Sequence, residues 1–97
     1  MRRLSLREEA ESEIIAAALH YETERPGLGF RFESELNKTI TRLVESPLQF
    51  REIDPGVRRA FLNIFPYGVF FTADHDTVLV IAVLHLHRHP DTWKGCR

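Results

Sequence analysis

Apolar side chains in the first half of the chain follow two patterns in succession. Leu4 and Leu6 alternate with polar neighbours, which indicates a short strand. The next stretch repeats apolar residues at helical spacing, namely Ala10, Ile14, Ala17, Ala18 and Tyr21. Glutamates at its start suit the positive end of a helix dipole, and Pro26–Gly27 ends the pattern. We therefore predict a short strand followed by a helix over about residues 8–25.

A second apolar stripe follows the break formed by residues 26–29, whose sequence is Pro-Gly-Leu-Gly. Its members recur at helical spacing, at Phe32, Leu36, Ile40 and Leu43, and Ser46–Pro47 closes the element. Because the linker between the two stripes is only a few residues long, we expect the two helices to form an antiparallel hairpin.

β-Branched and aromatic residues dominate the second half of the chain. Three such runs follow one another, Val57–Ile64, Tyr67–Thr72 and Thr77–Leu86, with turn-forming residues between them. Three successive strands predict an antiparallel meander. The last run has no polar alternation across Val78–Leu84, so we predict that it is a central strand covered on both faces.

Together these elements predict an α+β fold, in which a helical hairpin packs on a roughly four-stranded antiparallel sheet. The element order is strand–helix–helix–strand–strand–strand. A chain of 97 residues has room for one core of this kind, so residues 1–97 are expected to form a single domain. One helical layer covers one face of a sheet, so we expect the other face to be partly open to a partner or substrate.

Composition and charge indicate where in the cell the protein resides and what kind of molecule it binds. The longest apolar run is shorter than the roughly 20 residues that cross a bilayer, and the N-terminus has no apolar signal segment, so we expect a cytoplasmic protein without a membrane partner. The net charge of −1 disfavours a general nucleic-acid binder. Residues 57–97 nevertheless hold 5 Lys/Arg against 3 Asp/Glu and four of the five histidines. An anionic target or an acidic partner is therefore expected on that half.

The sequence contains no general catalytic signature. Phosphate-binding loops, nucleophile elbows, dinucleotide fingerprints and Cys-x-x-Cys pairs are all missing, which disfavours most enzyme classes. His85, His87 and His89 are spaced by two, so in an extended strand they would share a face and could chelate a metal ion. Pro90 ends the strand there, and no separate acidic or cysteine cluster supplies a fourth ligand. We therefore expect neither a metal site nor a cofactor.

Arginines and aromatic residues are the remaining candidates for a site. Arg58 and Arg59 are adjacent on a predicted strand and so point to opposite faces, which predicts that one of them is structural. Arg88 offers a planar fork for phosphate or carboxylate beside histidines able to shuttle protons; the alternative is a solvated arginine at a strand end. Tyr67 and Trp93 are interpreted as packing residues rather than base-stacking platforms.

These local signals, taken in order, resemble the ParE/RelE superfamily of toxins, the plasmid-stabilisation proteins. The resemblance spans nearly the whole chain and rests on the order and spacing of the following segments: Tyr21-Glu22, Pro26-Gly27-Leu28-Gly29 with Phe32 and Leu36, Leu43 with Ser46–Pro47, Val57-Arg58-Arg59, Phe65-Pro66-Tyr67-Gly68-Val69, the apolar last strand, His85, Arg88, Pro90 and Trp93. It implies the toxin of a type II toxin–antitoxin system, which a cognate antitoxin neutralises by wrapping an extended and helical segment over it.

The resemblance leaves two mechanisms open, because ParE-like members poison DNA gyrase whereas RelE-like members cleave messenger RNA on the ribosome. The start of the predicted strand at Phe65-Pro66-Tyr67 and the Pro-Gly-Leu-Gly linker look more like the ParE side. Lys94 is the one lysine in residues 57–97, which is fewer than a ribosome-dependent nuclease leads us to expect. Where many relatives read His-Gly-Arg-Arg, this chain reads His-Leu-His-Arg from His85 to Arg88.

We therefore expect a non-enzymatic toxin that binds a cellular protein such as DNA gyrase. The alternatives are an endoribonuclease and a degenerate member that binds antitoxin without toxicity. The residues expected to contact target or antitoxin are Arg58, Arg59, Tyr67, His85, Arg88 and Trp93. A ribonuclease would use His85, His87 and Arg88, yet Arg88 alternates away from both histidines as long as the strand persists. That geometry favours the protein-binding toxin.

Overall fold

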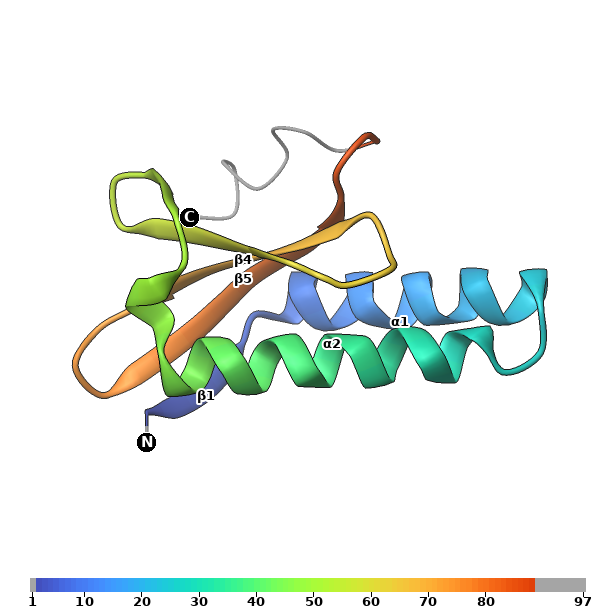
Figure 1. Cartoon of the computed structure of the whole chain (residues 1–97), viewed down its shortest axis with the longest axis horizontal. Helices are drawn as coiled ribbons and strands as arrows, with labels where there is room; N and C mark the ends of the chain where they lie inside the picture. The colour runs from blue at the N-terminus through green and yellow to red at the C-terminus, as the bar shows by residue number, and fades with distance from the viewer. Residues whose placement is uncertain (1, 89–97) are drawn as a thin grey trace.

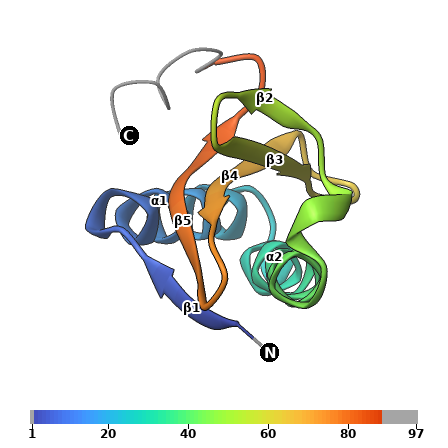
Figure 2. The same ribbon diagram turned by 90° about the vertical axis from the view of Figure 1, so that its left-hand side faces the viewer.

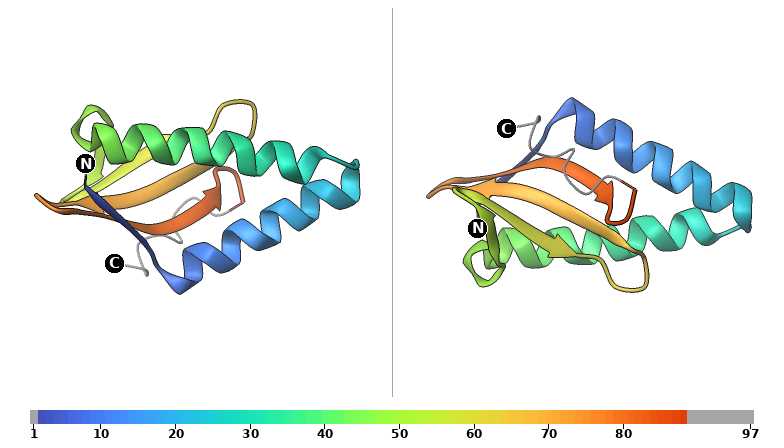
Figure 3. Two further views of the ribbon diagram at one scale, coloured as in Figure 1. Left: turned by 90° about the horizontal axis from the view of Figure 1, so that it is seen from below. Right: turned by 90° about the horizontal axis from the view of Figure 1, so that it is seen from above.

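Two antiparallel helices pack on one face of a five-stranded sheet in the computed structural model, which describes residues 2–88 (Figure 1). Helix α1 spans Glu8–Glu24 and α2 spans Leu28–Glu45, followed by a short 3-10 turn at Pro47–Gln49. The predicted helical hairpin is thereby confirmed. Figure 3 shows that the helices converge at the loop between them and diverge toward their other ends.

The sheet contains β1 (Arg3–Leu6), β2 (Glu52–Asp54), β3 (Val57–Phe61), β4 (Tyr67–Ala73) and β5 (Thr77–His85). Their order across the sheet is β1-β5-β4-β3-β2, with β1 parallel to β5 and the remaining neighbours antiparallel. The predicted layering and element order are therefore confirmed, and β5 is a central strand as expected. The strand count is one higher than predicted because β2 has three residues and too short a pattern to be recognised in sequence.

The main core lies between the helices and the sheet (Figure 2). Fully buried Phe32 and Leu43 of α2 meet Val69, Phe71 and Val80 of the two central strands. Phe32 also packs against aromatic rings from α1, from the loop before β4 and from the start of β4, with centroids 5.1 to 5.5 Å apart. Such offset and edge-on pairs add to the energy of burial and hold the far end of the hairpin against the sheet.

The sheet face away from the helices is more closed than the sequence predicts. A second cluster of side chains, each 4% exposed or less, lies there, formed by Val57, Phe70, Ile81, Ala82 and Leu84. Ile53 of β2 and Leu79 pack against this cluster. The expectation of a partly open face is therefore wrong for the centre of the sheet, because the apolar side chains there are already buried.

An extra residue in β5 decides which way its last side chains point. Phe70 is paired with Ala82 and Phe71 with Val80, so Ile81 forms a β-bulge in β5. Side chains before the bulge at Val80 and after it at Val83 both join the core under the helices. Without the extra residue, strict alternation would place Val83 and His85 on the opposite face from Val80.

No helix within residues 2–88 has both the length and the apolar character needed to span a bilayer.

Candidate functional site

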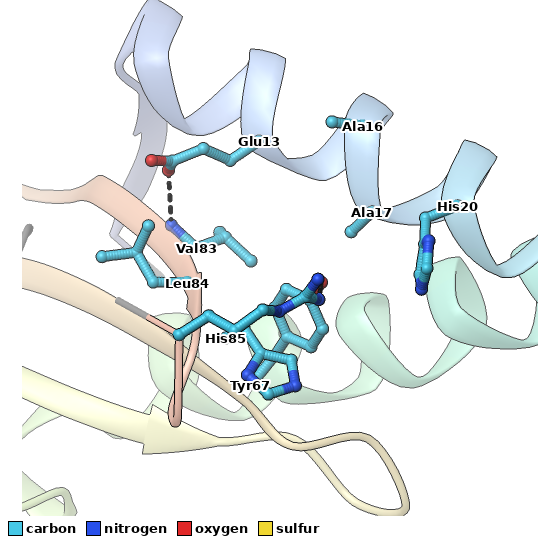
Figure 4. A pocket seen from close by; sticks show the side chains of 9 residues that line it. Glu13, Ala16, Ala17, His20, Tyr67, Val83, Leu84 and His85 are labelled. Atoms are coloured by element: carbon cyan, nitrogen blue, oxygen red, sulfur yellow. Dashed lines mark hydrogen bonds between the residues drawn. The ribbon is translucent and has the colours of Figure 1, made fainter. Parts of the chain in front are cut away.

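A surface pocket of about 330 Å³ lies between α1 and the end of β5 (Figure 4). Its lining comes from one face of α1, from the start of β4, and from the end of β5 with the turn that follows. The lining residues are Glu13, Ala16, Ala17, His20, Tyr67, Val83, Leu84, His85 and Arg88. Three residues predicted as site candidates, Tyr67, His85 and Arg88, thus meet in one place.

Tyr67 and His85 are brought together by the pairing of β4 with β5. They are direct cross-strand partners, and their rings pack edge to face with centroids 5.3 Å apart. Tyr67 is 6% exposed and also contacts the rings of Tyr21 and Phe32, so most of its surface serves packing, as the sequence predicts. The bulge at Ile81 is what turns His85 toward this side of the sheet.

The strand ends at His85, and residues 86–88 form a turn. The backbone N–H of His87 donates to Nδ1 of His85 at 3.2 Å, and the two imidazole centroids are 5.7 Å apart. The turn brings Arg88 back, so that its Nη2 lies 3.4 Å from the Tyr67 hydroxyl oxygen, to which it donates. The alternation predicts that Arg88 points away from His85 only as long as the strand persists. The strand ends at His85, so this condition is not met, and both side chains line the pocket.

The positive charge of Arg88 reaches into the aromatic cluster behind the pocket. Burial raises the pKa of the Tyr21 phenol, the Tyr67 phenol raises it further, and the guanidinium of Arg88 acts in the opposite direction. Among the described residues that line the pocket, this guanidinium is the one permanent cation. Arg88 is exposed to solvent, and its guanidinium is held against the Tyr67 hydroxyl. An exposed guanidinium held in this way suits the recognition of a carboxylate or phosphate.

Glu13 and His20 of α1 are part of the pocket, although the sequence analysis did not single them out. Oε1 of Glu13 accepts the backbone N–H of Val83 at 2.9 Å, as Figure 4 shows. Nε2 of His20 lies 3.1 Å from a carboxylate oxygen of Glu24, one turn further along the helix. The helical spacing could have predicted this placement, because Glu13 and His20 lie four and three residues from buried Ala17 and so share its face of the helix.

The adjacent arginines of β3 lie outside this pocket and on opposite faces of the sheet, as predicted. Arg58 pairs with Phe71 of the main core, and its Nη1 donates to the Phe50 carbonyl at 2.7 Å. Arg59 pairs with Phe70 of the second cluster, and its guanidinium carbon lies 4.5 Å from the ring centroid of Phe61. Arg58 is therefore the arginine that ties backbone segments together.

Two further candidates cannot be placed, because Trp93 and His89 lie outside the described residues. Within residues 2–88, no group of three or more histidine, cysteine or acidic side chains is arranged to hold a metal ion. His85 and His87 approach one another, but the contact between them is the backbone N–H donated to an imidazole nitrogen.

Comparisons with known proteins agree with this architecture. The family model for the ParE toxin of the type II toxin-antitoxin system parDE matches residues 4–90. Among solved structures, a chain of the chromosomal ParDE TA system from P. aeruginosa has a TM-score of 0.77 at 18% sequence identity. The match covers 88% of this chain and 96% of that chain, and at this identity it shows the shared fold. No curated protein sequence matches the chain.

Proposed function

The chain belongs to the ParE toxin family of type II toxin–antitoxin systems, and from this premise we propose that it arrests growth by binding a cellular protein. The candidate target is DNA gyrase, which the family resemblance implies. A cognate antitoxin neutralises the toxin in the cytoplasm. Such an interface typically buries more than about 1,200 Å² in total.

The observation that carries this proposal is the dispersal of positive charge over the second half of the fold. Residues 57–88 contain three arginines and no lysine. Arg58 is bonded to a carbonyl on the helix side, Arg59 stacks on Phe61 on the other side, and Arg88 lines the pocket. Binding to RNA depends on several cations that neutralise neighbouring phosphates, and these three do not form such a group. A protein interface needs only a few aromatic and arginine anchors.

Ribonuclease activity is the second candidate, because the turn after β5 gathers Tyr67, His85 and Arg88. Cleavage of a phosphodiester requires a general base, a general acid and a cation within hydrogen-bond reach of the scissile phosphate. A histidine, a phenol and a guanidinium supply these three chemical types. Within residues 2–88, Arg88 would then be the only permanent cation lining the pocket to stabilise the developing charge.

Expression of the toxin alone separates the candidates. Purified protein is expected to inhibit gyrase supercoiling in proportion to its concentration, while the positions of messenger RNA ends in induced cells stay unchanged. Codon-phased cleavage that is lost in a His85→Ala, Arg88→Ala double variant, with gyrase unaffected, overturns the proposal in favour of the ribonuclease. The matched control is a His75→Ala, Arg31→Ala double variant, since both residues are exposed and neither lines the pocket.

The antitoxin part of the proposal has its own test. Co-expression with the product of the adjacent small reading frame should relieve the growth defect and yield a complex that purifies as one species. Separate elution of the two proteins contradicts it. A complex that forms although the toxin alone neither inhibits gyrase nor cleaves RNA identifies a degenerate member without toxicity.

A further inference from the structure

Large apolar side chains lie exposed on the face of the helical hairpin that points away from the sheet. Ile15, Leu19 and Phe30 are 61%, 62% and 77% exposed. Each lies two positions from a buried residue of the same helix, Ala17 or Phe32, and two positions correspond to a rotation of about 200° around a helix. These side chains therefore point away from the core, and clustered exposure of this kind marks an interaction surface.

A groove runs between α1 and α2 on this face, and we call it the hairpin groove. Where the helices converge, a hollow of about 330 Å³ lies between Ile15 and Leu19 of α1 and Phe30 of α2. Where they diverge and β1 crosses the space between them, a second hollow of about 680 Å³ follows (Figure 3, left). Apart from Phe30, its apolar lining consists of Leu4, Leu6, Ile14, Leu36 and Ile40. Phe30 lines both hollows, so this exposed ring projects between them.

The second hollow has room for an aromatic ring from another molecule. A closed cavity of about 150 Å³ holds a benzene molecule, and this hollow has about 680 Å³. Ser34, one turn after Phe30 on α2, also lines it, and the small serine side chain lets another helix approach closely. Phe30 is the kind of side chain that such a hollow accepts, since large apolar rings gain most from burial. The hairpin groove thus carries both a projecting ring and a hollow that fits a ring.

The two ends of the hairpin groove carry opposite charges. The end near the loop between the helices is lined by Glu22 and Glu33. Toward the other end, beside β1, the lining includes Lys38 and Arg2. The Lys38 side chain is 70% exposed although its Nζ lies 3.2 Å from Glu35, so its charge remains accessible to a partner. A bound surface therefore matches the groove best when its own charges run in the opposite order.

A second copy of the chain meets both requirements. A two-fold axis across the groove places the same surface of two chains face to face in opposite directions. The carboxylates of one copy then face the cations of the other, and each Phe30 reaches the second hollow of its partner. Docking in the same direction would instead oppose like charges and place the two Phe30 rings against each other. Exposed ion pairs add little affinity, so we assign the orientation to the charges and most of the affinity to Phe30.

We propose that the hairpin groove is the interface of a two-fold homodimer in which each chain inserts Phe30 into the second hollow of the other. Within residues 2–88, the groove shares no lining residue with the pocket between α1 and the end of β5. Dimerisation therefore leaves the lining of that pocket unused in both chains, and the inference does not depend on the proposed function.

Truncation of Phe30 should separate the dimer. Analytical ultracentrifugation of the full chain is expected to show a dimer at micromolar concentration. Phe30→Ala should raise the dissociation constant at least about tenfold, because it removes the aromatic anchor of the interface. The ring is exposed in the single chain, so the fold should persist, which circular dichroism verifies. Phe61→Ala is the matched control and should leave the dimer unchanged, since Phe61 is 52% exposed and lies on β3, outside the groove.

Filling the second hollow should also weaken the dimer, although it adds apolar surface. Thr41 is exposed and lines this hollow, so Thr41→Trp occupies the space that Phe30 of the other copy needs. Nonspecific association through exposed apolar residues would instead become stronger. A mixture of Phe30→Ala and Thr41→Trp chains should associate about tenfold more tightly than either variant alone. The mixed dimer keeps one intact contact, because Phe30 of the Thr41→Trp chain enters the open hollow of the Phe30→Ala chain.

The oligomeric state of these chains decides between this interface and its alternatives. A wild-type chain that stays monomeric up to about 100 μM overturns the proposal. If Phe30→Ala then weakens a complex with antitoxin or gyrase, the groove belongs to that partner instead. A dimer that Phe30→Ala and Thr41→Trp both leave unchanged forms through another surface. A mixture of the two variants that associates no more tightly than either alone refutes the insertion of Phe30 into the second hollow.

Discussion

Replacing Glu22 should destabilise the helical hairpin, because this residue of α1 caps the N-terminus of α2. Its carboxylate oxygens accept the Gly27 N–H at 2.9 and 3.1 Å and the Gly29 N–H at 3.0 Å. Gly27 stands at the N-cap position of α2, with φ of 91°, and has no side chain with which to satisfy these donors. The last turn of α1 therefore stabilises the first turn of α2.

The expected cost follows from these contacts. Loss of an N-cap side chain costs about 0.5 to 2 kcal/mol, and loss of a negative charge at a helix N-terminus adds about 0.3 to 1 kcal/mol. Because Glu22 is exposed, we expect about 1 to 2 kcal/mol for Glu22→Ala. For a domain of this size each kcal/mol lowers the melting temperature by roughly 4 to 8 °C.

Thermal and urea unfolding followed by circular dichroism measure this effect. Glu22→Gln retains an acceptor oxygen without the charge, so it should lose about half as much stability as Glu22→Ala. Glu33→Ala, which removes an exposed carboxylate from the second turn of α2, should leave the midpoint close to that of wild type. If Glu22→Ala and Glu33→Ala unfold at the same midpoint, the cap contributes nothing and the reasoning is refuted.

Three further variants test other contacts of the fold. Gly29→Ala places a Cβ 2.5 Å from the backbone oxygen of Ala18, so differential scanning calorimetry should show a loss of stability of about 1 to 3 kcal/mol, even though alanine favours a helix. A rise in stability would contradict the close approach of the two helices at Gly29. In urea unfolding, Arg58→Met should lower the free energy of unfolding by about 1 to 2 kcal/mol, because it removes the hydrogen bond to the Phe50 carbonyl, and Arg59→Met should lower it by about 0.5 to 1 kcal/mol. The reverse order would show that Arg58 is not the structural arginine. Hydrogen bonds from the backbone N–H groups of Asp76 and Thr77 hold the pKa of Asp74 below its ordinary value of 3.8. The ionised carboxylate therefore stabilises the fold above pH 3.8, and this stabilisation is lost as the pH falls through the lowered pKa. Asp74→Ala should therefore melt below wild type at neutral pH, and equal melting temperatures there would contradict the argument.

The sequence by itself determined the elements whose signal is local. Helical spacing and a Pro-Gly break place α1 and α2 within about three residues of their actual ends, because burying one face of a helix demands that spacing. The runs of β-branched and aromatic residues likewise locate β3, β4 and β5. The unbroken apolar run of β5 predicts a central strand, since both of its faces are covered.

Tertiary structure alone decided how the ends of these elements meet. The bulge at Ile81 reverses the alternation of β5, and the strand stops at His85, so Arg88 turns back toward Tyr67. Simple alternation from the sequence predicts the opposite, because a bulge depends on how two strands fit together and leaves no pattern in either strand alone. The bond from Val83 to Glu13 joins residues 70 positions apart, and it exists because β1 is shorter than the strand beside it. The pocket is assembled from such long-range contacts, which local periodicity does not encode.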